Sequence, residues 1–183
     1  MVLMFCFIVS MLTIAAPSNV YACSCIEPLT VEEQLSQSKA VFTGRVLKVK
    51  ENTNLNGYRT TSALFEIDQI WKGGSESQII IHTGSGGGDC GYHFEEGKEY
   101  LVYASLSTMY GDKEQLVTIS CDRTNILAQA QADLAVLGEG KVPTEQVNLE
   151  DQLGFSSLYV WAIVVGIVVI GMLVFFVWRK RRI

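Results

Sequence analysis

Positively charged side chains are scarce in this chain outside its last five residues. The 183 residues contain 14 Lys and Arg against 19 Asp and Glu, and four of the cations stand together at positions 179–182. The remaining 10 basic and 19 acidic residues give a net charge of −9, because residues 1–22 carry no charge at all. A surface this acidic repels phosphate groups, so the composition excludes nucleic acid as a partner.

Histidine is almost absent, which limits metal and acid–base chemistry. Only His82 and His93 occur, and Cys90 three positions before His93 would supply a fragment of a zinc site. Zinc needs four ligands with free thiolates, and oxidation removes the thiolates. The glycine-rich residues 84–88 are followed by no Gly-Lys-Ser/Thr string, so they are no phosphate loop. We find no Ser/His/Asp or paired-carboxylate pattern, and we expect neither an enzyme nor a cofactor.

The uncharged N-terminal segment predicts export. Residues 3–16 are almost wholly apolar, a length typical of a signal peptide and too short for a membrane span. Pro17 ends this run, and Val-Tyr-Ala at 20–22 suits a signal peptidase. We therefore predict a signal peptide at 1–22, with Cys23 as the first residue of the mature chain. An uncleaved N-terminal anchor is the alternative.

A second apolar segment lies near the C-terminus. Residues 158–178 carry no charge, match the ~20 residues that cross a bilayer, and have Tyr159, Trp161 and Trp178 near their ends. The basic tail at 179–183 should remain in the cytoplasm. The sequence thus predicts a single-pass protein of the cell membrane, with an extracellular domain at 23–138 and a polar, acidic stalk at 139–157.

The cysteines predict two disulfides. Cys6 would leave with the signal peptide, so the mature chain keeps Cys23, Cys25, Cys90 and Cys121. An even number in a small exported domain indicates disulfide bonds. A bond between Cys23 and Cys25 would be strained, which leaves two long-range pairings open. Each bond would contribute ~4 kcal/mol in the loop-entropy model.

The pattern of the extracellular domain is mainly β. Thr30 and Glu33 form a capping box that predicts a short helix to about residue 39, and Asn56-Gly57 is a hairpin signal. Apolar positions at helical spacing predict a helix over 125–137, ended by Gly138. Five strands of this length suit a small closed barrel of the oligonucleotide/oligosaccharide-binding (OB) type, with all pairs antiparallel. The predicted strands are 40–50, 58–71, 78–83, 99–106 and 115–121.

Several short strings together resemble one family. The set resembles the N-terminal, netrin-like domain of the tissue inhibitors of metalloproteinases, over roughly residues 23–138. The strings are Cys23-Ser24-Cys25 after the expected cleavage site, VFTGRV at 41–46, FEI at 65–67 with IWKG at 70–73, Cys90-Gly91-Tyr92, and Thr118-Ile119-Ser120-Cys121.

This resemblance implies a function and its residues. It implies an OB barrel with disulfides Cys23–Cys90 and Cys25–Cys121. The free α-amino group and carbonyl oxygen of Cys23 would chelate the catalytic zinc of a target metalloprotease, which is the only metal contact implied. Ser24 would enter the specificity pocket beside the zinc, and Gly87, Gly88 and Asp89 would flank it. The partner is then a zinc metalloprotease, and the membrane is contacted through residues 158–178.

Three alternatives stand beside the inhibitor hypothesis. The family's third disulfide and its C-terminal subdomain have no counterpart here, which favours a netrin-like binding module without inhibitory activity. A thiol-redox protein that uses Cys-x-Cys would keep free thiols. Lipidation of Cys23 would block its amine, although Tyr21 is a poor residue for that motif.

Overall fold

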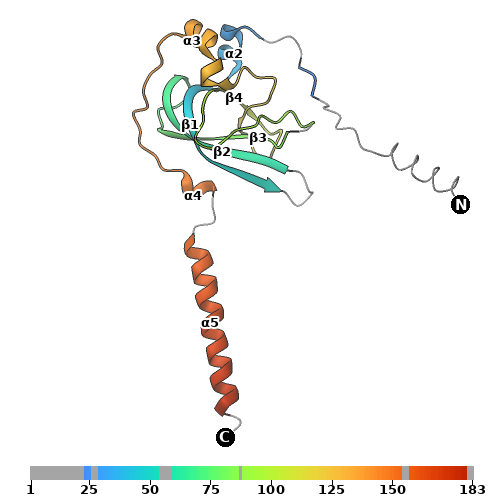
Figure 1. The fold of residues 1–183 in the computed structure, drawn as a ribbon, viewed down its shortest axis with the longest axis vertical. Helices are drawn as coiled ribbons and strands as arrows, with labels where there is room; N and C mark the ends of the chain where they lie inside the picture. The colour runs from blue at the N-terminus through green and yellow to red at the C-terminus, as the bar shows by residue number, and fades with distance from the viewer. Residues whose placement is uncertain (1–22, 26–28, 54–58, 87, 154–156, 181–183) are drawn as a thin grey trace, which may run out of the picture.

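The structure of this chain is a computed structural model that describes residues 23–25, 29–53, 59–86, 88–153 and 157–180, with side chains in the last segment only for 161–172 (Figure 1). The expected signal peptide at 1–22 and the Asn56-Gly57 turn lie outside the described residues. The elements in chain order are α2 Val31–Gln37, β1 Ala40–Thr53, β2 Arg59–Lys72, β3 Gln78–Gly84, β4 Glu99–Ser107, β5 Gln115–Val117, β6 Asn125–Ile126, the 3-10 turn η1 Leu127–Gln129, α3 Gln131–Leu137, α4 Glu150–Leu153 and α5 Ser157–Lys180.

Five strands form a closed ring of pairings. The order β1-β2-β3-β5-β4 closes because β1 also pairs with β4. The short strand β6 pairs with β4 as well, at Tyr100 and Leu101. The mainly β prediction is confirmed. The prediction that all pairs are antiparallel is wrong for β3 and β5, which run parallel through the pair His82 and Val117. The reason is connectivity: the intervening strand β4 pairs with β1 and β5, not with β3, so β3 and β5 point the same way.

Closure of the ring depends on a close approach at Gly44. This residue of β1 pairs with Tyr100 of β4 on one side and with Ile67 of β2 on the other. A Cβ at position 44 would lie 2.4 Å from the main-chain oxygen of Glu66. Only glycine lets the strand bend over its neighbour here, and the β1–β2 register shifts at this point.

Alternate side chains of the strands fill the inside of the ring. Phe65 lies at the centre, with edge-to-face contacts to Phe42 and Phe94 at centroid distances of 5.4 and 5.1 Å. Such edge-to-face contacts stabilise the core beyond the contribution of buried apolar area alone. The inner cluster consists of Ala40, Phe42, Val46, Ala63, Phe65, Ile67, Ile70, Ile81, Phe94, Tyr100, Val102 and Ala104.

The outer face of β1 and β4 is covered by the two short helices. Val41, Leu101 and Tyr103 are fully buried there, against apolar side chains from α2 and α3. This second layer explains why β4 reads as a continuous apolar run instead of alternating. Figure 1 shows α2 and α3 side by side over this end of the ring.

The helix predictions are partly confirmed. The capping box of α2 is present, with the Thr30 amide donating to Glu33 Oε2 at 2.9 Å and the Glu33 amide donating to Thr30 Oγ1 at 3.2 Å. The helix predicted over 125–137 begins only at residue 131. Residues 125–126 pair with β4 as β6 instead, because backbone groups at a sheet edge gain partners by extending it. Gly138 ends α3 with a φ of 69°.

The strand predicted over 115–121 ends at Val117, because the backbone amides that follow donate their hydrogen bonds to groups outside β4. The Ile119 amide donates to Asp122 Oδ2 at 2.9 Å, and the Ser120 amide donates to the Cys90 oxygen at 2.9 Å. The chain therefore turns away from β4 at this point and comes close to Cys90.

Part of the expected stalk at 139–157 packs along the ring. Ile70 and Lys141 exchange two backbone hydrogen bonds of 2.8 Å, and the Ser77 amide donates to the Glu145 oxygen at 2.7 Å. The segment ends at Leu153 of α4, whose side chain is only 4% exposed. We call residues 139–153 the strap, since they run back over β2 and β3.

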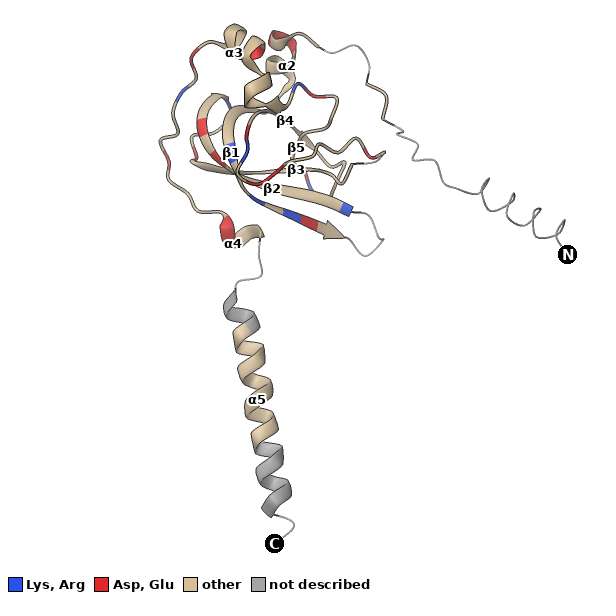
Figure 2. Cartoon of the chain, viewed as in Figure 1, with Lys and Arg blue, Asp and Glu red and all other residues tan. Residues whose placement is uncertain are grey.

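Helix α5 follows the strap. It is 24 residues long and carries no charged side chain at 161–172, where its side chains are described, as Figure 2 shows. Within the part of the chain that the structure describes, we find no helix with both the length and the apolar character of a membrane span. The span predicted at 158–178 is thus not confirmed.

Candidate functional site

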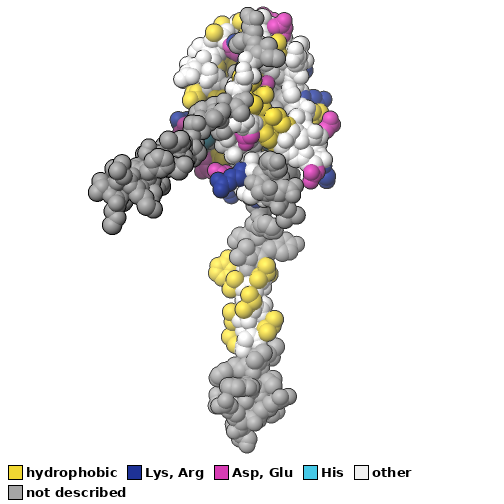
Figure 3. All heavy atoms as spheres, turned by 90° about the vertical axis from the view of Figure 1, so that its right-hand side faces the viewer, with side chains coloured by type: hydrophobic (Ala, Val, Ile, Leu, Met, Phe, Trp, Pro, Cys, Tyr) yellow, Lys and Arg dark blue, Asp and Glu magenta, His cyan; other side chains and the backbone are white. Residues whose placement is uncertain are grey.

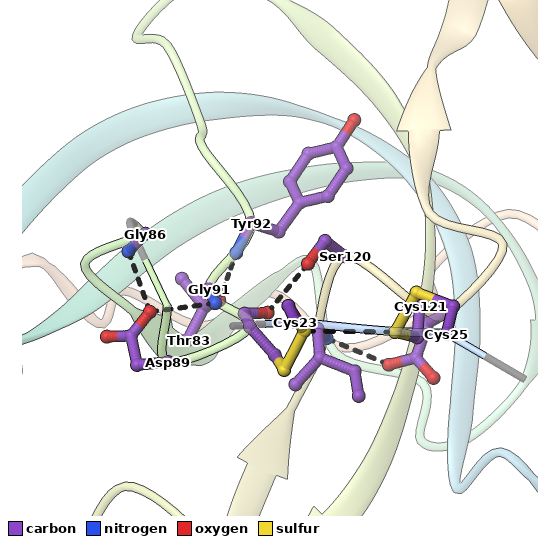
Figure 4. Close-up of a disulfide and its surroundings, with 12 residues drawn as sticks. Cys23, Cys25, Thr83, Gly86, Asp89, Gly91, Tyr92, Ser120 and Cys121 are labelled. Carbon is purple, nitrogen blue, oxygen red and sulfur yellow. Dashed lines mark hydrogen bonds between the residues drawn. A yellow bond between two sulfur atoms is a disulfide. The ribbon is translucent and has the colours of Figure 1, made fainter. Parts of the chain in front are cut away.

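Two neighbouring disulfides hold the N-terminal segment against the ring. Cys23 is bonded to Cys90 and Cys25 to Cys121, with Cα–Cα distances of 5.3 Å in both pairs. These are the pairings that the resemblance implies. The Cys23 and Cys121 sulfur atoms, which belong to different bonds, lie 4.0 Å apart (Figure 4). The string Cys23-Ser24-Cys25 is therefore fastened at both ends, with the Ser24 side chain exposed between them.

The loop between β3 and Cys90 is organised around the side chain of Asp89. Its Oδ2 accepts from the Ser85 amide at 2.7 Å, and its Oδ1 accepts from the amides of Gly86 and Gly91 at 2.9 and 3.0 Å. The Ser85 hydroxyl donates to Oδ2 at 3.3 Å. Hydrogen bonds to an ionised acceptor are stronger than neutral ones, so this carboxylate fixes a segment rich in glycine.

Two glycines meet at the neck of this loop. A Cβ on Gly91 would lie 2.3 Å from the carbonyl carbon of Gly84, and a Cβ on Gly84 would lie 2.5 Å from the Asp89 carboxyl group. The backbones touch because neither residue has a side chain. The Tyr92 amide then donates to Thr83 Oγ1 at 2.7 Å, which continues the neck toward the ring.

Cys90 has an unusual backbone and is held from the side of Cys121. Its φ is 60°, in the left-handed region that costs about 1 kcal/mol or more for a residue with a side chain. The Cys90 oxygen accepts from both the amide and the hydroxyl of Ser120, at 2.9 and 3.1 Å. These bonds and the disulfide to Cys23 maintain the conformation.

Tyr110 joins a further loop to this region. Its hydroxyl, in the loop between β4 and β5, donates a short hydrogen bond to the main-chain oxygen of Asp89. Burial raises the pKa of Tyr110 to about 12, so the phenol remains a donor at physiological pH. A cavity of about 390 Å³ lies beside the contact, lined by Arg59, Thr60, Asp89, Thr108, Met109, Tyr110, Gly111 and Asp112.

We call this surface the Cys23 edge: residues 23–25, the described residues of loop 84–91, and residues 118–121. On its inner side, burial raises the pKa of Asp122, while the hydrogen bond from Ile119 lowers it in part. Arg123, next in the chain, forms two bonds to Asp133 of α3 at 2.8 and 2.5 Å and donates to the Leu29 oxygen at 2.9 Å. Arg123 thus ties the segment after the Cys23 edge to α3 and to the entry of α2.

The structure brings most of the predicted site residues together. Cys23 is bonded to Cys90, which directly follows Asp89 in the chain. Gly88 belongs to the same loop and has a φ of 140°. Gly87 lies outside the described residues. Sequence reasoning missed Tyr110, Ser120 and the internal role of Asp89; only Asp89, as a turn-forming residue after glycines, gave a local signal.

The two histidines have different surroundings. His82 faces Ser62, with Nδ1 3.0 Å from Oγ, and burial lowers its pKa. His93 is exposed. Among the residues that the structure describes, no three His, Cys, Asp or Glu side chains gather as a metal site.

Comparison of the chain with models of protein families and with curated proteins finds no match. The interpretation of the Cys23 edge therefore depends on its chemistry.

Proposed function

We propose that this protein inhibits a zinc metalloprotease through the N-terminal residue of its mature chain, Cys23. The observation that carries the proposal is that Cys23 and Cys25 are each bonded to a different part of the ring, so that Ser24 is presented on a fixed, exposed edge. A short segment held in this way can enter a cleft without losing much conformational freedom.

The chemistry of the N-terminus suits a catalytic zinc. Such a zinc keeps one coordination position open for water. An α-amino group has a pKa near ~8, lower than that of lysine, and deprotonates readily. The amine nitrogen and the carbonyl oxygen of Cys23 would form a compact chelate that displaces the nucleophilic water. The Cys23 sulfur is occupied in the bond to Cys90, which argues against a thiol-redox role.

We also propose that the ring is a barrel of the OB type in a netrin-like domain. The strand order, with β1 paired to both β2 and β4 and with β3 parallel to β5, supports this assignment. So does the inner cluster, which fills the centre of the ring with aromatic and branched side chains.

The anchoring of the chain in a membrane remains part of the proposal. Helix α5 would extend for about 36 Å at the usual rise per residue. Its described side chains are apolar and face outward on all sides, as with Trp161 and Ile170 at 66% and 63% exposure. Figure 3 shows apolar side chains on both sides of the described part of α5. Resistance of the full chain to alkaline extraction from vesicles would support anchoring, and release would reject it.

The test of inhibition is an extension at the N-terminus. Mass spectrometry of the mature protein first establishes that it begins at Cys23 with an unmodified amine. A variant with one alanine inserted before Cys23 is then assayed against a panel of zinc metalloproteases, beside a control with one alanine added after Ile183. We expect the parent and the control to inhibit and the insertion variant to fail. Equal potency of all three would reject the mechanism.

The alternative is a binding module that does not inhibit. It is favoured by the absence of cysteines for the family's third disulfide. Capture of a partner that is not a protease, with equal affinity for the parent and for the insertion variant, would select this function over the inhibitor.

A further inference from the structure

The loop that flanks Cys23 contains four glycines among residues 84–88, a composition typical of a flexible segment. An inhibitory edge that had to order such a loop on binding would lose affinity. The contacts of Asp89 and Tyr110 remove this difficulty. We infer that Asp89 and Tyr110 are positioning residues, which hold the described residues of loop 84–91 in their binding conformation from inside while the partner contacts other atoms.

The carboxylate of Asp89 is occupied within its own loop. Both oxygens accept, from two donors each: the Ser85 amide and hydroxyl on Oδ2, and the Gly86 and Gly91 amides on Oδ1. Gly84 leaves the space for this side chain, since a Cβ there would lie 2.5 Å from the carboxyl group. Asp89 therefore acts on the loop, in contrast to the direct partner contact that the resemblance implies.

Tyr110 holds the same residue from outside the loop. Its hydroxyl donates to the main-chain oxygen of Asp89, so the contact does not depend on the carboxylate. Tyr110 belongs to the segment between β4 and β5. The end of this segment is fixed because β5 pairs with both β3 and β4. Two independent sets of contacts thus hold Asp89: the local hydrogen bonds to its carboxylate and the long-range bond from Tyr110 to its main-chain oxygen.

This inference rests on the proposed function for its kinetic consequence, but its structural part stands alone. If positioning keeps the loop in the competent state, losing a positioning bond lowers the competent fraction and the apparent affinity in proportion. The association rate should then fall, and the dissociation rate should change little, because the bound contacts remain the same.

Hydrogen exchange in the full chain, in detergent, tests the structural part. Loss of one hydrogen bond should speed the exchange of the amides it protects by about two- to tenfold. We expect Tyr110→Phe to speed exchange at the amides of Ser85, Gly86 and Gly91. The control Tyr103→Phe removes a hydroxyl that bonds to Asp133 on the outer face of the ring, and it should leave these amides unchanged.

Substitution of Asp89 separates positioning from simple loss of charge. In Asp89→Asn the amide oxygen can replace only one acceptor, so protection should persist at Gly86 and Gly91 and fall at Ser85. Asp89→Ala should expose all three amides. Glu114→Gln, an exposed carboxylate in the loop before β5, controls for the change in charge. Equal exchange in Asn and Ala variants, or unchanged exchange in Tyr110→Phe, would overturn the inference.

Inhibition kinetics provide the second readout. Against a protease that the parent inhibits, Tyr110→Phe should slow association by at most the roughly two- to tenfold change in the opening equilibrium of the loop and leave dissociation unchanged. A slower association without faster exchange would also contradict positioning. If the insertion before Cys23 has no effect, the proposed function fails, yet the exchange experiment still decides the role of Asp89 and Tyr110.

Discussion

The contact between Gly84 and Gly91 allows a sharp prediction about stability. In Gly91→Ala the new Cβ would lie 2.3, 2.4 and 2.7 Å from the carbonyl carbon, oxygen and Cα of Gly84. These are backbone atoms, so no side-chain rotation relieves the overlap. The two segments must separate by about 1 Å to reach an ordinary van der Waals distance.

The cost can be worked from the bonds at this neck. Overpacking costs about 1–3 kcal/mol. Separation of the segments also stretches the bonds from Gly91 to Asp89 and from Tyr92 to Thr83, and each is worth about 1 kcal/mol. We expect Gly91→Ala to lower the free energy of unfolding by about 3–5 kcal/mol, which corresponds to a fall in melting temperature of roughly 10–20 °C for a domain of this size.

Thermal and urea denaturation with the disulfides intact measure this change. The matched control is Gly111→Ala, where a Cβ would meet only the end of the Gln115 side chain at 3.1 Å. That side chain can move, so the control should lose less than about 1 kcal/mol. A Gly91→Ala protein as stable as this control would refute the reasoning about the neck.

Two further predictions concern the strap and His82. Leu153→Ala should destabilise the fold by about 2–3 kcal/mol in urea denaturation, because the Leu153 side chain is almost fully buried. The control Val142→Ala, at a residue that is 71% exposed, should change the stability little. Equal effects of the two substitutions would mean that the strap does not pack on the ring. Since burial lowers the pKa of His82 from 6.5, the unfolded chain takes up a proton first, and stability should fall as the pH drops below about 6.5. His82→Gln should reduce that slope and His93→Gln should not; the same slope in all three proteins would assign the pH dependence to other groups.

Much of the fold could be predicted because its determinants are local. The capping box at Thr30 and Glu33 depends on a few adjacent residues and is confirmed, and the strand predicted over 58–71 matches β2 closely. Burial on two faces hides alternation in β4, although a strand was predicted over 99–106. The end of β5 was missed because Asp122 and Cys90, rather than the strand's own sequence, decide where the ladder stops.

The candidate site shows the same division. The cysteine pairs followed from a family resemblance, and residues alone left two pairings open. The bond from Tyr110 to Asp89 joins positions 21 residues apart through the packing of two loops, and no local pattern encodes it. The strap was expected to be a stalk because its sequence shows no helical or strand periodicity. Main-chain hydrogen bonds such as those of Lys141 hold it on the ring. Such bonds do not depend on side chains, so the composition gives little sign of them.

The 4.0 Å between the sulfur atoms of Cys23 and Cys121 has a practical consequence for handling the protein. If a reductant opens the bond between Cys23 and Cys90, the released Cys23 thiolate faces the second disulfide and can displace Cys25 from Cys121. Reoxidation would then yield an isomer of identical mass with its N-terminus fastened the other way. Peptide mapping under acidic conditions, which stop exchange, is therefore the appropriate quality control for any sample exposed to thiols.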